Sequence, residues 1–74
     1  MLYQIFQKKS EYDSDSSAKM VARYGDDRLY TKGEIITLNS NKGPVKLKIV
    51  KIEEDHDLTR VFKEEFYHVY VLKL

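Results

Sequence analysis

Apolar and polar residues alternate along the middle of the chain and then shift by one position. From Val45 to Ile49 the apolar side chains alternate with lysines, which is the pattern of a strand with one buried face. Ile49 and Val50 are then adjacent, and Ile52 falls on the opposite face from Ile49. This shift predicts a β-bulge near Ile49 and Val50, or a sharply coiled strand shared by two sheet layers. Both alternatives indicate a small, strongly curved sheet.

Four further segments show strand-like alternation or a β-branched composition. They are Leu2–Lys9, Ala18–Tyr24, Gly33–Leu38 and Phe66–Leu74. Neither face of the first segment is cleanly apolar, and its terminal lysines discourage pairing with other chains, so we expect an edge strand there. Both faces of the last segment carry apolar residues, which predicts a central position in the sheet.

The segments between these strands carry turn and loop signals. Ser10–Ser17 is acidic and rich in serine, and we expect a mobile loop there. Asn39–Pro44 combines residues that tolerate positive φ with a proline suited to the start of a strand, so it predicts a tight turn. This turn joins Gly33–Leu38 and Val45–Ile52 into a hairpin.

Residues 53–66 are compatible with two local structures. Leu58, Val61 and Phe62 fall at helical spacing after Asp57, a candidate N-cap, and together they predict a helix of about two turns. The polar residues before them are equally typical of a long hairpin loop. Of these two, we expect the loop or a single short turn.

Five short strands with at most one short helix predict an all-β fold, or a β-dominated one, in a single domain over residues 1–74. A chain of this length buries only roughly 60% of the surface that its unfolded form exposes, and closing the sheet removes unpaired edges. We therefore expect a five-stranded, strongly bent antiparallel barrel. SH3-like, OB-like and PUA-like arrangements all fit the pattern.

Composition excludes several classes of protein. The chain has no cysteine, so it forms no disulfide and no thiolate metal site. It shows no signal-peptide pattern and no apolar run near the roughly 20 residues that span a bilayer, so we expect a soluble, cytoplasmic protein without a membrane partner. Its 13 Lys and Arg residues against 12 Asp and Glu residues give a formal net charge of +1, which does not favour a general polyanion binder.

Two groups of side chains are candidates for chemistry, and neither forms a recognisable site. Glu53–Asp57 holds four carboxylates and one imidazole, but its spacing does not match a calcium-binding loop, and a solvated loop is the simpler interpretation. His68 lies within the last predicted strand, where we expect a hydrogen-bonded structural histidine. No serine-nucleophile motif, phosphate-binding loop or dinucleotide fingerprint is present. We therefore expect no enzymatic activity, no metal site and no cofactor.

Lysines on one face of the predicted hairpin suggest a binding surface. Lys46 and Lys48 project from the same face, Lys42 lies in the adjoining turn, and we expect Tyr67 on a neighbouring strand to lie near them. Lysines beside aromatic rings on a sheet face suit single-stranded nucleic acid, because the charges meet phosphates and the rings stack on bases. The alternative is that these lysines only keep an exposed sheet face soluble.

The stretch from Arg23 to Leu38, R-Y-G-D-D-R-L-Y-T-K-G-E-I-I-T-L, resembles part of the ASCH/PUA-like barrels. The shared pattern is an Arg, a polar turn, Asp-Arg, an aromatic residue and a Gly-acid pair that opens an apolar strand. The matching residues are Arg23, Asp27, Arg28, Tyr30, Gly33 and Glu34. The resemblance implies a PUA-like barrel whose cleft, lined by such Arg and acidic residues, handles RNA or a nucleobase-like ligand. It covers 16 of the 74 residues, its spacing differs by one residue at Gly25-Asp26, and the early helix of that family has no counterpart in Ser10–Ser17.

Two functions follow as expectations. The first is a small non-enzymatic regulatory protein that binds RNA, single-stranded or structured, with lysines on the phosphates. The candidate contact residues are Arg23, Arg28, Tyr30, Lys42, Lys46, Lys48 and Tyr67. The second is a protein-interaction module, such as a compact enzyme inhibitor or an assembly factor, that uses Tyr-rich surface, an exposed strand edge or the acidic segments. The near-neutral net charge and two acidic loops favour this second function over a general nucleic-acid binder.

Overall fold

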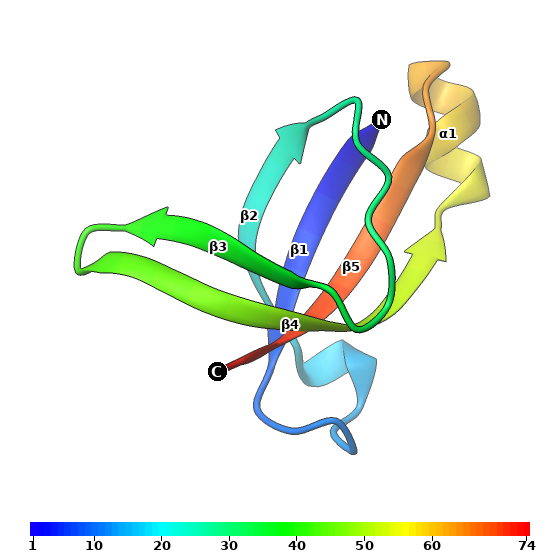
Figure 1. Cartoon of the computed structure of the whole chain (residues 1–74). Helices are drawn as coiled ribbons and strands as arrows, with labels where there is room; N and C mark the ends of the chain where they lie inside the picture. Colours follow the sequence, from blue (N-terminus) through cyan, green and yellow to red (C-terminus); the bar gives the residue numbers. More distant parts are fainter.

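Strand β5, Phe66–Lys73, lies at the centre of a five-stranded sheet that curls into a half-barrel (Figure 1). The computed structural model describes residues 1–74, and the strand order is β2-β1-β5-β4-β3. The other elements are β1, Leu2–Lys8; the 3-10 helix η1, Asp15–Ser17; β2, Lys19–Gly25; β3, Ile35–Ser40; β4, Gly43–Glu54; and α1, His56–Phe62. A β-dominated fold with one short α-helix is therefore confirmed, and β5 takes the predicted central position.

The sheet is mixed rather than antiparallel, because β1 runs parallel to β5 while the other three pairs are antiparallel. This corrects the expected antiparallel barrel, and the sheet stays open between β2 and β3. It also corrects the position of β1, which lies between β2 and β5 and not at an edge. Lys8 is one of the lysines that gave this segment the pattern of an edge strand. Its ammonium group forms hydrogen bonds within the structure, since Lys8 Nζ donates to Glu11 O and to Asp15 Oδ1.

The predicted bulge is present in β4. Ile49 pairs with Val71 and Lys51 pairs with Tyr70, the residue immediately before Val71, so Val50 is the extra residue. The extra residue returns Ile52 to the same face as Ile49, where a regular strand would place them on opposite faces. Ile52 accordingly packs against the same core as Ile49. A bulge also bends its strand, and the two halves of β4 run in different directions in Figure 1.

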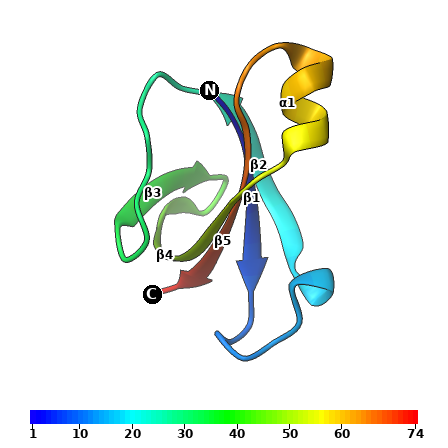
Figure 2. The same cartoon turned by 90° about the vertical axis from the view of Figure 1, so that its right-hand side faces the viewer.

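The concave face of the half-barrel holds the core. Its buried members are Tyr3, Ile5, Tyr30, Ile36, Leu47, Ile49, Val69 and Val71. Tyr30 belongs to the connection between β2 and β3, which crosses over this face (Figure 2). The Tyr3 ring meets the Tyr30 ring edge-on at 4.8 Å and stacks on the Tyr67 ring at 5.5 Å. The tyrosines therefore close the open side of the half-barrel.

Helix α1 lies on the opposite, convex side of the sheet (Figure 2). Its N-cap is Asp55, whose Oδ1 accepts a hydrogen bond from the Leu58 N–H at 3.0 Å. The Phe62 ring stacks on the Phe66 ring of β5, with centroids 5.6 Å apart. The expected loop is therefore wrong, and the N-cap lies two residues before the candidate Asp57. No helix of the structure has the length and apolar character needed to cross a membrane.

Candidate nucleic-acid interface

The β3–β4 hairpin turns at Asn41 and Lys42, which is a shorter turn than the sequence predicts. Ser40 pairs with Gly43, and Ser40 Oγ donates to Gly43 O at 2.7 Å. Gly43 has φ of +108°, a conformation that favours glycine, while Asn41 and Lys42 have negative φ. This combination is typical of a hairpin turn with a glycine bulge. It places Lys42 at the exposed tip of the hairpin.

Two further lysines lie on the convex face of the hairpin. Lys46 pairs with Thr37 and Lys48 pairs with Ile35. Because Leu47 points into the core, its neighbours on either side point outward, about 7 Å apart along the strand. Both lysines are exposed, and neither forms an ion pair. The predicted shared face of these lysines is therefore present.

Charge is strongly segregated along the chain around this hairpin. Residues 35–52 contain four lysines and no Asp or Glu, whereas residues 53–65 contain six carboxylates. The hairpin projects to the side of the molecule away from α1, which follows the acidic end of β4 (Figure 1). A molecule with a net charge of +1 therefore carries a local surface of one sign.

Two lysines outside the predicted set lie beside this surface. Lys73 lines the same shallow hollow as Lys42 and Lys46. Lys32 lines a second hollow with Lys48, and one carboxylate, that of Glu11, is also present there. The sequence alone does not predict that Lys73 lies near the hairpin, because only the pairing of β4 with the end of β5 brings it there.

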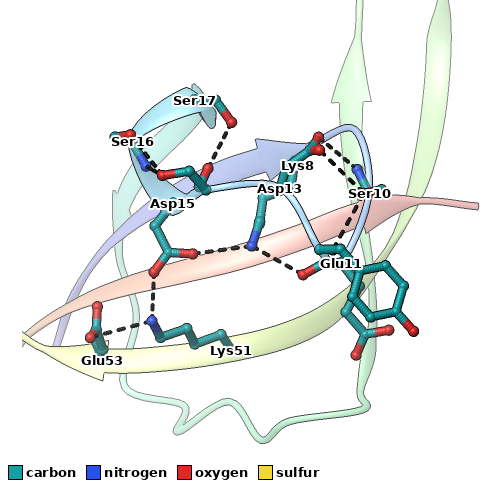
Figure 3. A network of polar contacts seen from close by, with 11 residues as sticks. Lys8, Ser10, Glu11, Asp13, Asp15, Ser16, Ser17, Lys51 and Glu53 are labelled. Atoms are coloured by element: carbon teal, nitrogen blue, oxygen red, sulfur yellow. Dashed lines mark hydrogen bonds and ion pairs between the residues drawn. The ribbon is translucent and has the colours of Figure 1, made fainter.

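Lys51, the fourth lysine of the segment, is held by carboxylates. Figure 3 shows Asp15 between two ammonium groups: its Oδ2 accepts from Lys51 Nζ at 2.5 Å and its Oδ1 accepts from Lys8 Nζ at 3.1 Å. Glu53 lies 3.5 Å from the Lys51 ammonium. Hydrogen bonds from Lys51 and then Lys8 lower the pKa of the Asp15 carboxyl. This network fastens the segment 10–17 to the sheet and sets Lys51 apart from Lys46 and Lys48.

Arg28 and Tyr30 are brought together, but in a structural arrangement. The Arg28 guanidinium pairs with Glu34 and lies 4.9 Å from the centroid of the Tyr30 ring. Tyr30 is only 8% exposed, and its hydroxyl donates to Asp26 Oδ2 at 3.1 Å. Burial raises the pKa of the Tyr30 phenol, and the Arg28 backbone N–H is the main cause of a lowered pKa at Asp26. The Tyr30 ring is therefore part of the core and is not an open platform for a base.

The structure separates Arg23 and Tyr67 from the lysines. Tyr67 pairs with Glu54 at one end of the β4–β5 ladder, whereas Lys48 lies near its other end, so the expected proximity of Tyr67 is wrong. Its ring packs on the concave side against the core. Arg23 lies on β2, which is the opposite edge strand of the sheet from β3.

The acidic segment before α1 has structural roles. Asp55 Oδ2 lies 2.9 Å from His68 Nε2, and the contact with His68 lowers the pKa of the Asp55 carboxyl. Glu54 Oε2 accepts from Thr59 Oγ1 at 3.1 Å. His68 is thus hydrogen-bonded within the sheet, as the sequence predicts. No group of three or more His, Asp or Glu side chains is arranged to hold a metal ion.

We expect the free energy of unfolding to decrease as the pH falls below about 4. Asp15, Asp26 and Asp55 each fasten a connecting segment, and each carboxyl has a pKa below the ordinary 3.8. A lowered carboxyl pKa gives stability that is complete above the unfolded value and is lost as the pH falls through the folded value. Urea unfolding at a series of pH values measures this dependence.

The matched control for this pH dependence is Asp27→Asn, because Asp27 is an exposed neighbour in the same acidic turn. A triple variant with Asn at positions 15, 26 and 55 should be less stable at neutral pH and lose less stability in acid. A triple variant with the parent's pH dependence would contradict the assignment.

Three comparisons with known proteins give no match: no protein-family model, no curated protein and no solved structure is similar to this chain. The structure supports a small five-stranded half-barrel and, within it, a projecting basic hairpin.

Proposed function

We propose that this protein is a cytoplasmic, non-enzymatic RNA-binding protein whose β3–β4 hairpin contacts the phosphate backbone. Lys42, Lys46 and Lys48 supply the phosphate contacts, with Lys73 beside them. Lysine ammonium groups bind phosphate as point charges, and contacts to phosphate carry no base-sequence information directly. Binding through such contacts depends little on base sequence.

The observation that carries this proposal is the absence of Asp and Glu from residues 35–52. Solubility alone is usually served by surface charges of both signs in a mixed arrangement. This hairpin presents lysines only, and the three at its tip and on its convex face have no carboxylate partner. A single-sign surface on a nearly neutral protein attracts a polyanion without making the whole molecule bind it.

The resemblance of Arg23–Leu38 to PUA-like barrels supports the same class of ligand. Two of the matching residues, Arg28 and Glu34, form an ion pair with each other in the β2–β3 connection. We propose that this connection holds the open side of the half-barrel and that the RNA lies along the hairpin. Tyr30 is buried in the core and Tyr67 is partly buried against it, which argues for contacts with phosphates instead of stacked bases.

The experiment is a fluorescence-anisotropy titration with a labelled oligouridylate of about 20 nucleotides. With three phosphates neutralised, the slope of log K against log salt should be about −2 for a single strand, so affinity falls about 20-fold between 50 and 200 mM salt. A duplex RNA of the same length gives the comparison with structured RNA. Absence of binding at low salt, or an affinity independent of salt, would overturn the proposal.

A further inference from the structure

A second surface lies at the other edge of the sheet. A groove of about 480 Å³ runs between α1 and β2 on the convex face. Its walls are mostly apolar, with Leu2 from β1, Leu58 and Phe62 from α1, and Phe66 from β5. Phe62 is 54% exposed although it is one of the largest apolar side chains in the protein. The groove opens towards β2, where Arg23 and Gly25 form its rim.

Strand β2 offers unpaired backbone groups next to this groove. It pairs only with β1, and its Met20 and Val21 side chains are 51% and 44% exposed. The Asp26 N–H donates to Met1 O, so Asp26 and Met1 form a hydrogen-bonded pair of the antiparallel β1–β2 ladder. Hydrogen-bonded and non-hydrogen-bonded pairs alternate along such a ladder, and the backbone groups of a non-hydrogen-bonded pair point away from the partner strand. By that alternation, Arg23 and Gly25 direct their N–H and C=O groups outward. An edge strand of this kind is a template for a further strand.

We propose that the β2 edge binds a short extended segment of a partner protein that carries an apolar residue and an acidic residue. The segment adds to the sheet beside β2, its backbone bonds to Arg23 and Gly25, and its apolar side chain enters the groove above Leu2 and Phe62. Its acidic residue lies beside Arg23, which is on the same convex face as the groove. This surface is separate from the basic hairpin, since β2 and β3 are opposite edges of the sheet.

Charge selects an acidic segment. Arg23 lies at the groove, is exposed and forms no ion pair, and β2 contains no carboxylate. Lys19 pairs with Gln7 and therefore lies on the other face of the sheet. Asp26 and Asp27 follow β2, so the opposite end of the bound segment favours neutral or basic residues. The Arg23 side chain and the aspartates that follow β2 therefore determine which end of the bound segment is acidic.

The same charges disfavour a second copy of this chain. Pairing two β2 edges through their outward groups at Arg23 would bring the Arg23 side chains of both copies together, and like charges directly opposite each other are destabilising. The pairing register with β1 also shifts between Ile5 and Phe6, which leaves Val21 as an extra residue and bends the edge. Such a bulge discourages continuous pairing along the whole edge, and the outward groups of Arg23 and Gly25 lie in the regular part of β2 beyond it.

The test is selection of random peptides of about seven residues, displayed on phage, against the immobilised protein of residues 1–74. Selected peptides should share an acidic residue and an apolar residue on one face of an extended chain. The decisive variant is Gly25→Val, since an added Cβ lies 3.6 Å from Leu2 Cδ2, an ordinary contact, and Gly25 does not have the positive φ that needs glycine. The valine Cβ therefore has room on the strand, and we expect its methyl groups to occupy space at the rim of the groove.

Gly25→Val should weaken binding of the selected peptides by about tenfold or more, because an overfilled site must shift its side chains or backbone to accept the peptide. Thr37→Val on β3, the other edge strand, is the matched control and should bind like the parent. Arg23→Glu should also weaken binding, and a peptide with its acidic residue changed to Lys should regain affinity for that variant. This charge swap keeps the test valid if Gly25→Val fails to fold.

Three results would overturn the proposal. The first is no enrichment of peptides over empty support. The second is enrichment of peptides that bind Gly25→Val and Arg23→Glu as well as they bind the parent. The third is a dimer of this chain in sedimentation velocity that Gly25→Val abolishes, since a second copy would then be the occupant.

Discussion

The double variant Lys46→Glu, Lys48→Glu should lose RNA affinity by about tenfold or more and remain folded. Each lysine that contacts a phosphate contributes about one unit to the salt slope, so the slope should become shallower as well as the affinity weaker. Both side chains are exposed on the convex face and support no core contact. Anisotropy titrations at several salt concentrations measure both quantities.

The matched control is Lys9→Glu, Lys19→Glu. These lysines are also exposed and without an ion pair, and the net-charge change is the same, but they lie at β1 and β2 instead of the hairpin. The control should keep most of the parent's affinity and salt slope. Equal losses in the two double variants would mean that net charge, and not the hairpin, determines binding.

Tyr3→Ala should cost about 3–5 kcal/mol of unfolding free energy, the range for removing a buried aromatic ring. Tyr3 is 1% exposed, contacts the Tyr30 and Tyr67 rings, and donates from its hydroxyl to Arg28 O at 2.5 Å. Small domains have total stabilities near the lower end of about 5–15 kcal/mol, so this variant should be largely unfolded. Urea unfolding followed by circular dichroism measures the loss.

Tyr3→Phe is the control for the ring cluster. It keeps the ring and removes one hydrogen bond, so the expected cost is about 1 kcal/mol. A Tyr3→Ala variant with the parent's urea midpoint would show that the tyrosines do not hold the half-barrel together. That result would also contradict the packing role assigned to Tyr30 and Tyr67.

Local patterns predict the parts of this fold that local contacts determine. The alternation and its shift predict the bulge at Val50, and the turn residues predict the hairpin. The faces of Lys46 and Lys48 follow from the same alternation. The apolar faces of Phe66–Leu74 predict the central position of β5.

Other parts depend on contacts between distant segments and were therefore not predictable. The parallel pairing of β1 with β5 joins the two ends of the chain, and no local pattern specifies it. Helix α1 is short, and its N-cap Asp55 is held by His68 from β5, so its propensity alone did not distinguish it from a loop. The burial of Tyr30 and the distance of Tyr67 from the lysines follow from topology and register.

The two proposed surfaces occupy opposite edges of one sheet, and they predict different ligands. The hairpin edge carries lysines and suits a polyanion. The β2 edge has unpaired backbone groups beside an apolar groove and suits an extended peptide segment. The protein-interaction function expected from the sequence is therefore compatible with RNA binding on the same molecule.

The most direct test of the central claim, that the β3–β4 hairpin is the RNA-binding surface, is an amide NMR titration with the oligouridylate at low salt. We predict chemical-shift changes concentrated on residues 39–48, with the amides of α1 unaffected. Changes centred on α1 or β2 with an unaffected hairpin, or no change at all, would contradict the claim.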